Sequence, residues 1–317
     1  MTRTLFAFDP AFRAPRGGLI IDLQRSLARA GDFPVSVDGV FASQSVSAMK
    51  LWQAKAGIAA TGAVDDLSWL GLTHTNKPSL FRRCLSLTAA YEGQGYTLAV
   101  GNFDGAGLTW GIVGFTLLTG DLAKVIKTIE ARSPGILATS FGDNAAELLH
   151  ILGTSKADKT AWANKISTGP KKVGLRTDWL DGFETLGNRA IARAVQDEIA
   201  HDDYWRIAAR DLGTYGKMTE LDAAIFFDTA VQSGGVNDEK GDAVRAALKK
   251  LPGGASDRDR LSAIAEALTT GVNPNYVSDV RSRRMSIATG TGKVHGATYK
   301  ISNWGLDQLP ITAADLA

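Results

Sequence analysis

The composition of this chain changes abruptly near residue 80. No glutamate occurs among the first 80 residues of the 317-residue chain, and all of its glutamates lie beyond them. A polar stretch that contains Pro78 spans residues 73–79 and follows an apolar run ending at Leu72, a pattern that is typical of a linker. The chain is also long for one small module. We therefore expect two domains, residues 1–75 and 76–317.

Composition restricts the class of protein. Apolar residues make up 44% of the chain and charged residues 21%, as in globular proteins with a core. A net charge of +2 argues against a nucleic-acid binder that neutralises many phosphates. One cysteine, Cys84, and four histidines without zinc-binding spacing predict no metal site, and we expect no cofactor. No segment has the roughly 18 apolar residues of a membrane helix, and the first ten residues lack the core of a signal peptide.

Apolar periodicity predicts three short helices in the first domain. Ile20, Leu23 and Leu27 recur at helical spacing. A second helix is expected between residues 43 and 57, where Ser43 or Ser45 would cap its start, and a last helical turn between 65 and 72. The predicted module is large enough to fold but poor in candidate catalytic groups.

Four short sequences in this segment form a recognisable pattern: LQRSL at 23–27, VDGVF at 37–41, AMKLWQ at 48–53, and GI followed by TGAVD at 57–65. Over residues 17–72 the segment resembles the peptidoglycan-binding domain of bacterial and phage cell-wall hydrolases. The resemblance implies a three-helix module that binds bacterial peptidoglycan, with Asp38, Phe41 and Gln53 near the ligand groove. A purely structural role in the three-helix core is the alternative for each of these residues.

A helix is predicted after the linker and ends close to a glutamate. Leu80, Leu87 and Tyr91 fall on one helical face, and Gly93 should end the helix. Glu92 then lies in the last turn, where the negative end of the helix dipole and an apolar wall disfavour the carboxylate. We expect its pKa to be raised, as a general acid requires. A solvated glutamate before a glycine would give the same pattern.

A β-hairpin is predicted next, with a strand at 96–100 and a second strand or bend at 106–115. The turn between them contains Asp104 and Gly105, which by themselves are a common turn signal. Together with Glu92, however, Asp104 makes a pair of carboxylates a dozen residues apart. Glycoside hydrolysis needs such a pair, one group to protonate the leaving oxygen and the other to activate water or attack the sugar carbon.

The run DGAGLTWGIVGF at residues 104–115, preceded by Glu92, resembles the signature of the family 46 glycoside hydrolases, the chitosanases of the lysozyme-like superfamily. The resemblance covers about residues 78–308. It implies a mainly α chain, in which a lysozyme-like α+β catalytic domain with a small β-hairpin lobe follows the three-helix module. It also implies Glu92 as general acid, Asp104 as general base, and Thr109 as a hydroxyl that helps to hold the attacking water. Inversion at the anomeric carbon would suit carboxyls about 6.5–9.5 Å apart.

Further residues receive roles from the same resemblance. Asp121 would contact sugar, and Tyr96 and Trp110 are candidates for substrate binding. Asp228 would be structural and would pair with Arg284 to orient the Glu92 loop. Ordinary structural roles are the alternatives, since Asp121 also suits the start of a helix.

The substrate is predicted to differ from chitosan. The loop between Glu92 and Asp104 is shorter than in typical chitosanases, and Ala106 stands where they often carry an arginine. A charge-balanced catalytic region also does not favour a polycationic polymer. We therefore expect a peptidoglycan hydrolase of lysozyme (muramidase) type that cuts the β-1,4 glycan of the cell wall. A true chitosanase and a non-catalytic wall-binding protein with a decayed hydrolase domain are the alternatives.

Two routes to the cell wall are open for such an enzyme. The sequence predicts a protein made in the cytoplasm without a signal peptide, acting on the periplasmic or extracellular wall. A phage endolysin released through a holin fits this description, as does a bacteriolytic effector injected into a competitor, which would need an immunity protein. We expect a monomer that binds peptidoglycan and no nucleic acid.

Overall fold

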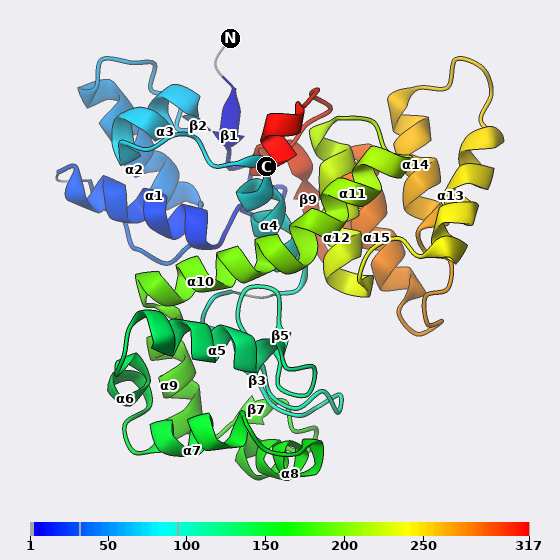
Figure 1. Ribbon diagram of the computed structural model, residues 1–317. Coiled ribbons are helices and arrows are strands. Elements are labelled where there is room, and N and C mark those ends of the chain that lie inside the picture. The colour runs from blue at the N-terminus through cyan, green and yellow to red at the C-terminus, as the bar shows by residue number, and fades with distance from the viewer. Residues whose placement is uncertain (1–2, 32, 94, 317) are drawn as a thin grey trace. The chain divides into compact units, whose positions relative to one another are not determined.

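The computed structural model describes residues 3–31, 33–93 and 95–316 (Figure 1). The chain forms two compact units: unit 1 comprises Met1–Tyr91 and Asp203–Ala317, and unit 2 comprises Glu92–Asp202. Helices dominate both units and the strands are short, which confirms the mainly α prediction. The predicted domain boundary at residue 75 stays a prediction, because unit 1 groups the first 91 residues with the C-terminal part of the chain.

The first part of unit 1 is a small helical module. Its elements are β1 (Thr4–Phe6), α1 (Gly18–Arg29), α2 (Ser43–Lys55), β2 (Val64–Asp65) and α3 (Asp66–Thr73). The three helices occupy the segments that periodicity predicted, although Ala42 and not a serine precedes α2. Strand β1 was not predicted; it pairs with β2 and adds Leu5 and Phe6 to the module core.

The remainder of unit 1 is a helical bundle with a C-terminal hairpin. Its elements are α4 (Leu80–Tyr91), α11 (Arg206–Tyr215), α12 (Glu220–Ser233), α13 (Asp238–Lys249), α14 (Asp257–Ala267), α15 (Val277–Thr289), β8 (Thr291–Val294), β9 (Ala297–Lys300), and the 3₁₀ helices η2 (Ile301–Trp304) and η3 (Ala313–Leu316). Side chains of Thr219, Asn237 and Ser256 cap the first turns of α12, α13 and α14, where the backbone N–H groups lack helical partners. Within the bundle, α12 packs against α4, α11 and α15.

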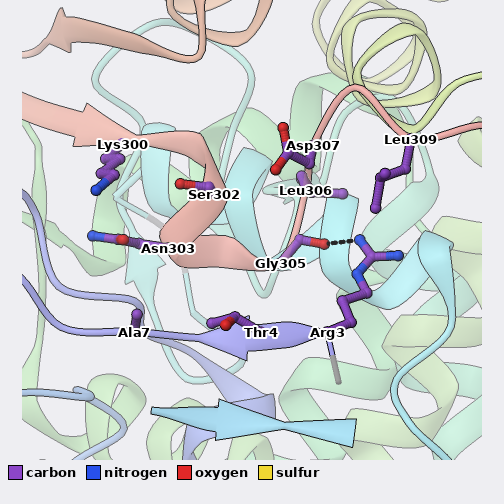
Figure 2. Close-up of a pocket in the computed structure, with 10 residues that line it drawn as sticks. All are labelled: Arg3, Thr4, Ala7, Lys300, Ser302, Asn303, Gly305, Leu306, Asp307 and Leu309. Atoms are coloured by element: carbon purple, nitrogen blue, oxygen red, sulfur yellow. Dashed lines mark hydrogen bonds between the residues drawn. The ribbon is translucent and has the colours of Figure 1, made fainter. Parts of the chain in front are cut away.

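The two parts of unit 1 are tied together by the N-terminal strand. The N–H of Ala7 donates to the carbonyl of Asn303, and the Arg3 guanidinium bonds both Glu220 and the carbonyl of Gly305. Figure 2 shows β1 running beside the C-terminal segment. A cavity of about 500 Å³ is lined by residues of both segments. The module at the start of the chain is therefore part of one packed body with the C-terminal helices.

In its described residues, unit 2 combines two small antiparallel sheets with six α-helices. Its strands are β3 (Ala99–Val100), β4 (Thr109–Trp110), β5 (Phe115–Thr116), β6 (Ser167–Thr168) and β7 (Gly174–Leu175), and its helices are α5 (Asp121–Arg132), α6 (Ile136–Phe141), α7 (Asn144–Ile151), α8 (Lys156–Ile166), α9 (Thr177–Gly187) and α10 (Ala190–Ala200). A π-helical turn, His201–Trp205, follows α10. Strands β3, β4 and β5 form an antiparallel sheet with β4 in the centre, so the predicted hairpin has a third strand.

Aromatic side chains hold this sheet to the helices of unit 2. Trp110 on β4 is fully buried, and its ring centroid lies 5.5 Å from that of Phe183 on α9. Phe183 packs edge-on against Phe141 at 5.0 Å, and Trp179 packs edge-on against Trp162 at 4.9 Å. The central strand β4 thus packs against a group of contacting aromatic rings.

Two general properties follow from the described helices and side chains. None of the described helices has both the length and the apolar character needed to cross a membrane. Among the described residues, no group of three or more histidine, cysteine or acidic side chains is arranged to hold a metal ion.

Candidate active site

Glu92 is the first residue of unit 2 and follows α4 directly. The sequence placed it in the last helical turn, but the structure ends α4 one residue earlier, and Glu92 lies half-buried in the turn that follows. Gly93 has a φ of +64°, a left-handed conformation that ends a helix, as predicted from the sequence. The role of Glu92 as the catalytic acid stays a prediction.

The residue at the end of α4, Tyr91, is fixed by the C-terminal part of unit 1. Its hydroxyl lies 2.7 Å from the hydroxyl of Ser286, and its ring packs edge-on against Tyr299 with centroids 4.8 Å apart. The guanidinium of Arg283 lies 5.4 Å from the centroid of the Tyr91 ring, within cation–π range. His295 Nδ1 lies 2.9 Å from the Tyr91 carbonyl oxygen. The chain therefore leaves α4 from an anchored position.

Asp228 pairs with Arg283, and the predicted pairing with Arg284 is wrong. Arg283 donates to Asp228 Oδ1 through Nη2 at 2.6 Å and through Nε at 3.2 Å, and both side chains are buried. Arg284 lies about 100° further around α15 and donates to the carbonyl of Leu268. The sequence pattern could not show which of two adjacent arginines faces α12. Burial lowers the pKa of Arg284 to about 10, which leaves it charged at neutral pH.

Asp104 stands at the exposed tip of the loop that joins β3 to β4. Its Oδ1 accepts the N–H of Ala106 at 3.0 Å, which closes an Asx-type turn. Gly105 has a φ of +83°, a conformation that glycine adopts without strain. The neighbouring residue, Phe103, leaves 54% of its surface exposed. Asp104 is therefore accessible to a ligand, and the turn orients its carboxylate.

The base of the same loop is organised by Asn102, which the sequence analysis missed. Its Oδ1 accepts the N–H of Gly107, and its Nδ2 donates to Asn164 Oδ1, both at 2.9 Å. Its backbone N–H donates to the Ser167 hydroxyl, also at 2.9 Å. Only its position just before the Asp104 turn could have suggested this role, because asparagine is common in turns for local reasons.

Thr109 and Trp110, which form β4, have different surroundings. Thr109 is half-buried and lies opposite Val100 and Thr116 in the central position of the sheet. Trp110 is fully buried against Phe183, so its predicted role in binding substrate is wrong for this structure. A buried ring offers no surface to a glycan, whereas the Thr109 side chain keeps partial access.

Tyr96 belongs to a buried network that supports the sheet. It is 7% exposed, and its hydroxyl donates to Asp197 Oδ1 at 2.6 Å. The adjacent Gln196 is fully buried and bridges two segments, since its Nε2 donates to the Tyr96 carbonyl and its Oε1 accepts the N–H of Ile112 at 2.9 Å. The surroundings of Tyr96 are those of a structural residue, not of the predicted sugar-binding one.

Asp121 is the first residue of α5 and is half-buried. Its Oδ2 accepts the Thr119 hydroxyl at 2.7 Å. A carboxylate in the first turn of a helix interacts favourably with the positive end of the helix dipole. This local role is the alternative that the sequence also allows, and it does not prevent Asp121 from contacting a sugar.

The wall-binding candidates of the N-terminal module are mostly internal. Phe41 is fully buried in the module core, so its predicted place at a ligand groove is wrong. Gln53 is 1% exposed, and it accepts the N–H of Gly62 and donates to the carbonyl of Ala63, both at 2.8 Å. Gln53 therefore also has a structural role in the module. Asp38 remains exposed, although its Oδ1 accepts from Gln24 Nε2 at 2.7 Å.

Gln24 and Gln53 repeat one structural device. Each accepts the N–H of a glycine with positive φ, Gly39 in the first case and Gly62 in the second, at 2.8 Å. Each also donates through Nε2 to a buried serine on the next helix. The module is thus built from two successive helix–turn–helix steps, each locked by a buried glutamine.

Comparison with known proteins gives two family matches. The model of glycosyl hydrolase family 46 matches residues 88–269, and the model of a peptidoglycan binding domain matches residues 16–69. The curated chitosanase of Bacillus subtilis (strain 168) is 26% identical over 184 residues, which cover 56% of this chain and 60% of that protein. This chain therefore spans less than two thirds of the length of its curated relative.

Solved chitosanases are similar at lower identity. The native chitosanase of Bacillus subtilis MY002 is 20% identical, with a TM-score of 0.44, over 68% of this chain and 87% of that chain. A family 46 chitosanase of Gynuella sunshinyii in complex with chitotetraose is 19% identical, with a TM-score of 0.45, over 67% of this chain and 88% of that one. Both resemblances inferred from the sequence motifs are confirmed by the family matches. Since the first match covers more than half of the sequence, this chain belongs to glycosyl hydrolase family 46.

Proposed function

We propose that the protein is a peptidoglycan hydrolase of lysozyme type, which cleaves the β-1,4 bond between N-acetylmuramic acid and N-acetylglucosamine. One observation carries the proposal: a single chain joins a family 46 hydrolase region to a peptidoglycan-binding region. A module that binds the wall raises the local concentration of glycan around a hydrolase linked to it. Such a module has no evident use on a soluble polymer.

The proposed chemistry uses two carboxyl groups. Glu92 donates its proton to the glycosidic oxygen of the leaving sugar, while Asp104 accepts a proton from a water whose oxygen attacks the anomeric carbon. The hydroxyl of Thr109 helps to hold that water. Displacement from the opposite face inverts the anomeric centre, so the β-linked substrate first yields an α-anomer. The exposed position of Asp104 and the partial exposure of Thr109 are compatible with these roles.

The charge of unit 2 supports a glycan with N-acetylated amines over chitosan. Unit 2 carries thirteen carboxylate side chains against eleven lysine and arginine side chains, so its charge is nearly balanced. A polycation such as chitosan is attracted by a strongly acidic surface. The N-acetylated amines of peptidoglycan carry no positive charge, and their binding does not need such a surface. We propose Asp121 as a further contact to sugar.

Chitosan is the second candidate substrate. It is favoured by a specific observation, because the curated relative that matches this chain is named a chitosanase. The two candidates share the same catalytic carboxyls and differ only in the sugars that occupy the site.

The route to the substrate is part of the proposal. A phage endolysin would reach the wall through a holin, whereas an injected antibacterial effector would require an immunity protein in the cell that makes it. Expression in the periplasm of a bacterial host separates the two routes. An effector is tolerated when its cognate neighbour gene is co-expressed, and an endolysin lyses the host in either case.

The test compares wild type with Glu92→Gln on purified sacculi and on chitosan. Loss of the acid should lower glycan cleavage by roughly 10²–10⁴-fold, while sacculi remain the better polymer for wild type. Glu184→Gln is the matched control, because Glu184 is an exposed carboxylate on α9 of the same unit and should leave the rate unchanged. Cleavage of chitosan but not of sacculi would favour the second candidate, and an unchanged Glu92→Gln would contradict catalysis at this position.

A further inference from the structure

The tip of the Asp104 loop carries an aromatic ring that the described part of the chain leaves uncovered. Phe103 is 54% exposed, the largest exposed fraction of any aromatic side chain in unit 2. It directly precedes Asp104, which is also exposed. A single exposed apolar side chain is common on protein surfaces and needs no function by itself. The position of this ring beside a carboxylate, on a loop with a fixed base, is what distinguishes it.

The base of the loop is fixed by hydrogen bonds of the buried Asn102 side chain. Asn102 is 8% exposed and uses both ends of its side-chain amide, one toward Gly107 on the same loop and the other toward Asn164 on α8. Asn164 Oδ1 also accepts from Lys172 Nζ at 2.7 Å. One asparagine thus closes the loop on itself and ties it to a neighbouring helix.

Close backbone packing adds to this restraint. The N–H of Gly101 donates to the carbonyl of Val173 at 2.9 Å. A Cβ atom at Gly101 would lie 2.4 Å from the Lys172 carbonyl oxygen, so no other residue fits here without displacing the backbone. On the other side of the loop, the N–H of Leu118 donates to the Ala106 carbonyl at 3.2 Å. The loop is therefore held at both ends while residues 103–105 project from it.

A rigid, exposed aromatic ring beside a carboxylate suits the apolar face of a sugar. One face of a pyranose ring presents C–H groups, and these pack against the electron-rich face of an aromatic ring. Only two torsion angles position a phenylalanine side chain, so the ring loses little conformational entropy when it binds a sugar. The adjacent carboxylate can accept hydrogen bonds from the hydroxyls at the edge of the same sugar.

We propose that Phe103 is a sugar-stacking residue of the glycan site, and that Asn102 is the positioning residue that holds Phe103 and Asp104 in place. The ligand class is a pyranose of a β-1,4-linked glycan, bound next to the bond that is cut. The proposal rests on the glycosidase function above and extends it, because it assigns a binding subsite to the loop that carries the proposed base.

Binding without turnover tests the stacking role directly. We would measure the affinity of soluble β-1,4-linked N-acetylglucosamine oligomers and of glycan chains from amidase-treated sacculi in a Glu92→Gln background. Phe103→Ala should weaken binding about tenfold, and Phe103→Trp should restore it. Leu149→Ala is the matched control, since Leu149 is an exposed apolar residue on α7 that should not affect binding. Equal affinities with phenylalanine and alanine at position 103 would overturn the proposal.

A double-mutant cycle between Asn102 and Phe103 tests the role of Asn102. If Asn102 acts through the loop tip, Asn102→Ala should weaken glycan binding when Phe103 is present and should have little further effect when it is alanine. In the enzyme with Glu92, the same substitution should also lower kcat, because Asp104 shares the loop. Additive effects on affinity, with kcat unchanged, would overturn the positioning role. Thermal unfolding of each variant shows whether the fold is retained.

The experiment also separates this inference from the proposed function. Phe103-dependent binding by a wild-type protein that cleaves neither polymer would support the stacking subsite and contradict the hydrolase activity. Cleavage of sacculi that does not depend on Phe103 would support the hydrolase activity and contradict the stacking subsite. Absence of binding to either glycan overturns the stacking role, whatever the activity.

Discussion

Individual ion pairs in this protein differ greatly in their surroundings. Asp228 and Arg283 are both buried, whereas Arg132 and Glu198 form a two-point ion pair at the surface, with Nη–Oε distances of 2.7 Å. Hydrogen bonds from Arg132 lower the pKa of Glu198. Water screens the exposed pair, so good geometry there contributes little to stability. Removing one member of a buried pair is expensive because the other member lies in a poorly solvated position.

We therefore expect Asp228→Ala to lower the free energy of unfolding by about 3–5 kcal/mol. The substitution removes the carboxylate that accepts from Arg283 beside the anchored Tyr91. Denaturant unfolding measures the change. Glu198→Ala is the control and should leave the unfolding midpoint nearly unchanged. Similar midpoints for the two variants would contradict the distinction between buried and exposed pairs.

The turn between β4 and β5 illustrates how an element is fixed by one glycine. Gly111 has a φ of +92°, and a Cβ atom there would lie 2.4 Å from Gln196 Oε1. That oxygen accepts the N–H of Ile112, so it cannot move away without losing this bond. Gly111 is thus required by backbone shape and close packing as well as by any catalytic role.

Gly111→Ala should consequently destabilise the protein more than Gly120→Ala does. Gly120 also has a positive φ, of +96°, but a Cβ atom there would meet no atom within 4 Å. Gly120→Ala should therefore lower the free energy of unfolding by about 1–2 kcal/mol, because alanine is strained in this backbone conformation. Gly111→Ala should lower it more, because the new Cβ atom would also clash with Gln196. Thermal unfolding of both variants provides the comparison. Equal losses would show that Gln196 does not restrain this turn.

Helix ends and local turns could be predicted from the sequence, whereas long-range pairing could not. The helix ending before Gly93 and the turn at Asp104 depend on local residue preferences, and both are present. The choice between Arg283 and Arg284 depends on how α15 is rotated against α12, which a single sequence does not specify. The burial of Trp110 likewise depends on Phe183, more than 70 positions away in the chain.

For the whole molecule, the main structural finding is that unit 1 is built from both ends of the chain. Glu220, at the start of α12, is 2% exposed and accepts from Arg83 Nη1 at 3.0 Å, from Arg3, and from the N–H of Asp307 at 3.1 Å. These partners belong to three separate segments of the chain. The pattern at residues 73–79, which is typical of a linker between two modules, does not indicate this connection.

Glu220→Ala should lower the free energy of unfolding by about 3–5 kcal/mol, because it leaves the buried Arg83 without its carboxylate. Glu266→Ala is the control, since Glu266 pairs with Arg281 at 2.6 Å on the surface of α14. Hydrogen exchange should show increased opening in β1 as well as in α12 for Glu220→Ala. Opening confined to α12 would contradict a shared unit.

The most direct test of the central claim is the chemical identity of the products released from purified sacculi. Mass spectrometry of reduced products, with NMR of the anomeric proton during early turnover, gives both the bond cut and its stereochemistry. An inverting muramidase that uses Glu92 as its acid should release reducing-end N-acetylmuramic acid, formed first as the α-anomer, and Glu92→Gln should give no such product. Reducing-end N-acetylglucosamine, cut peptides, or an unchanged yield from Glu92→Gln would contradict the central claim.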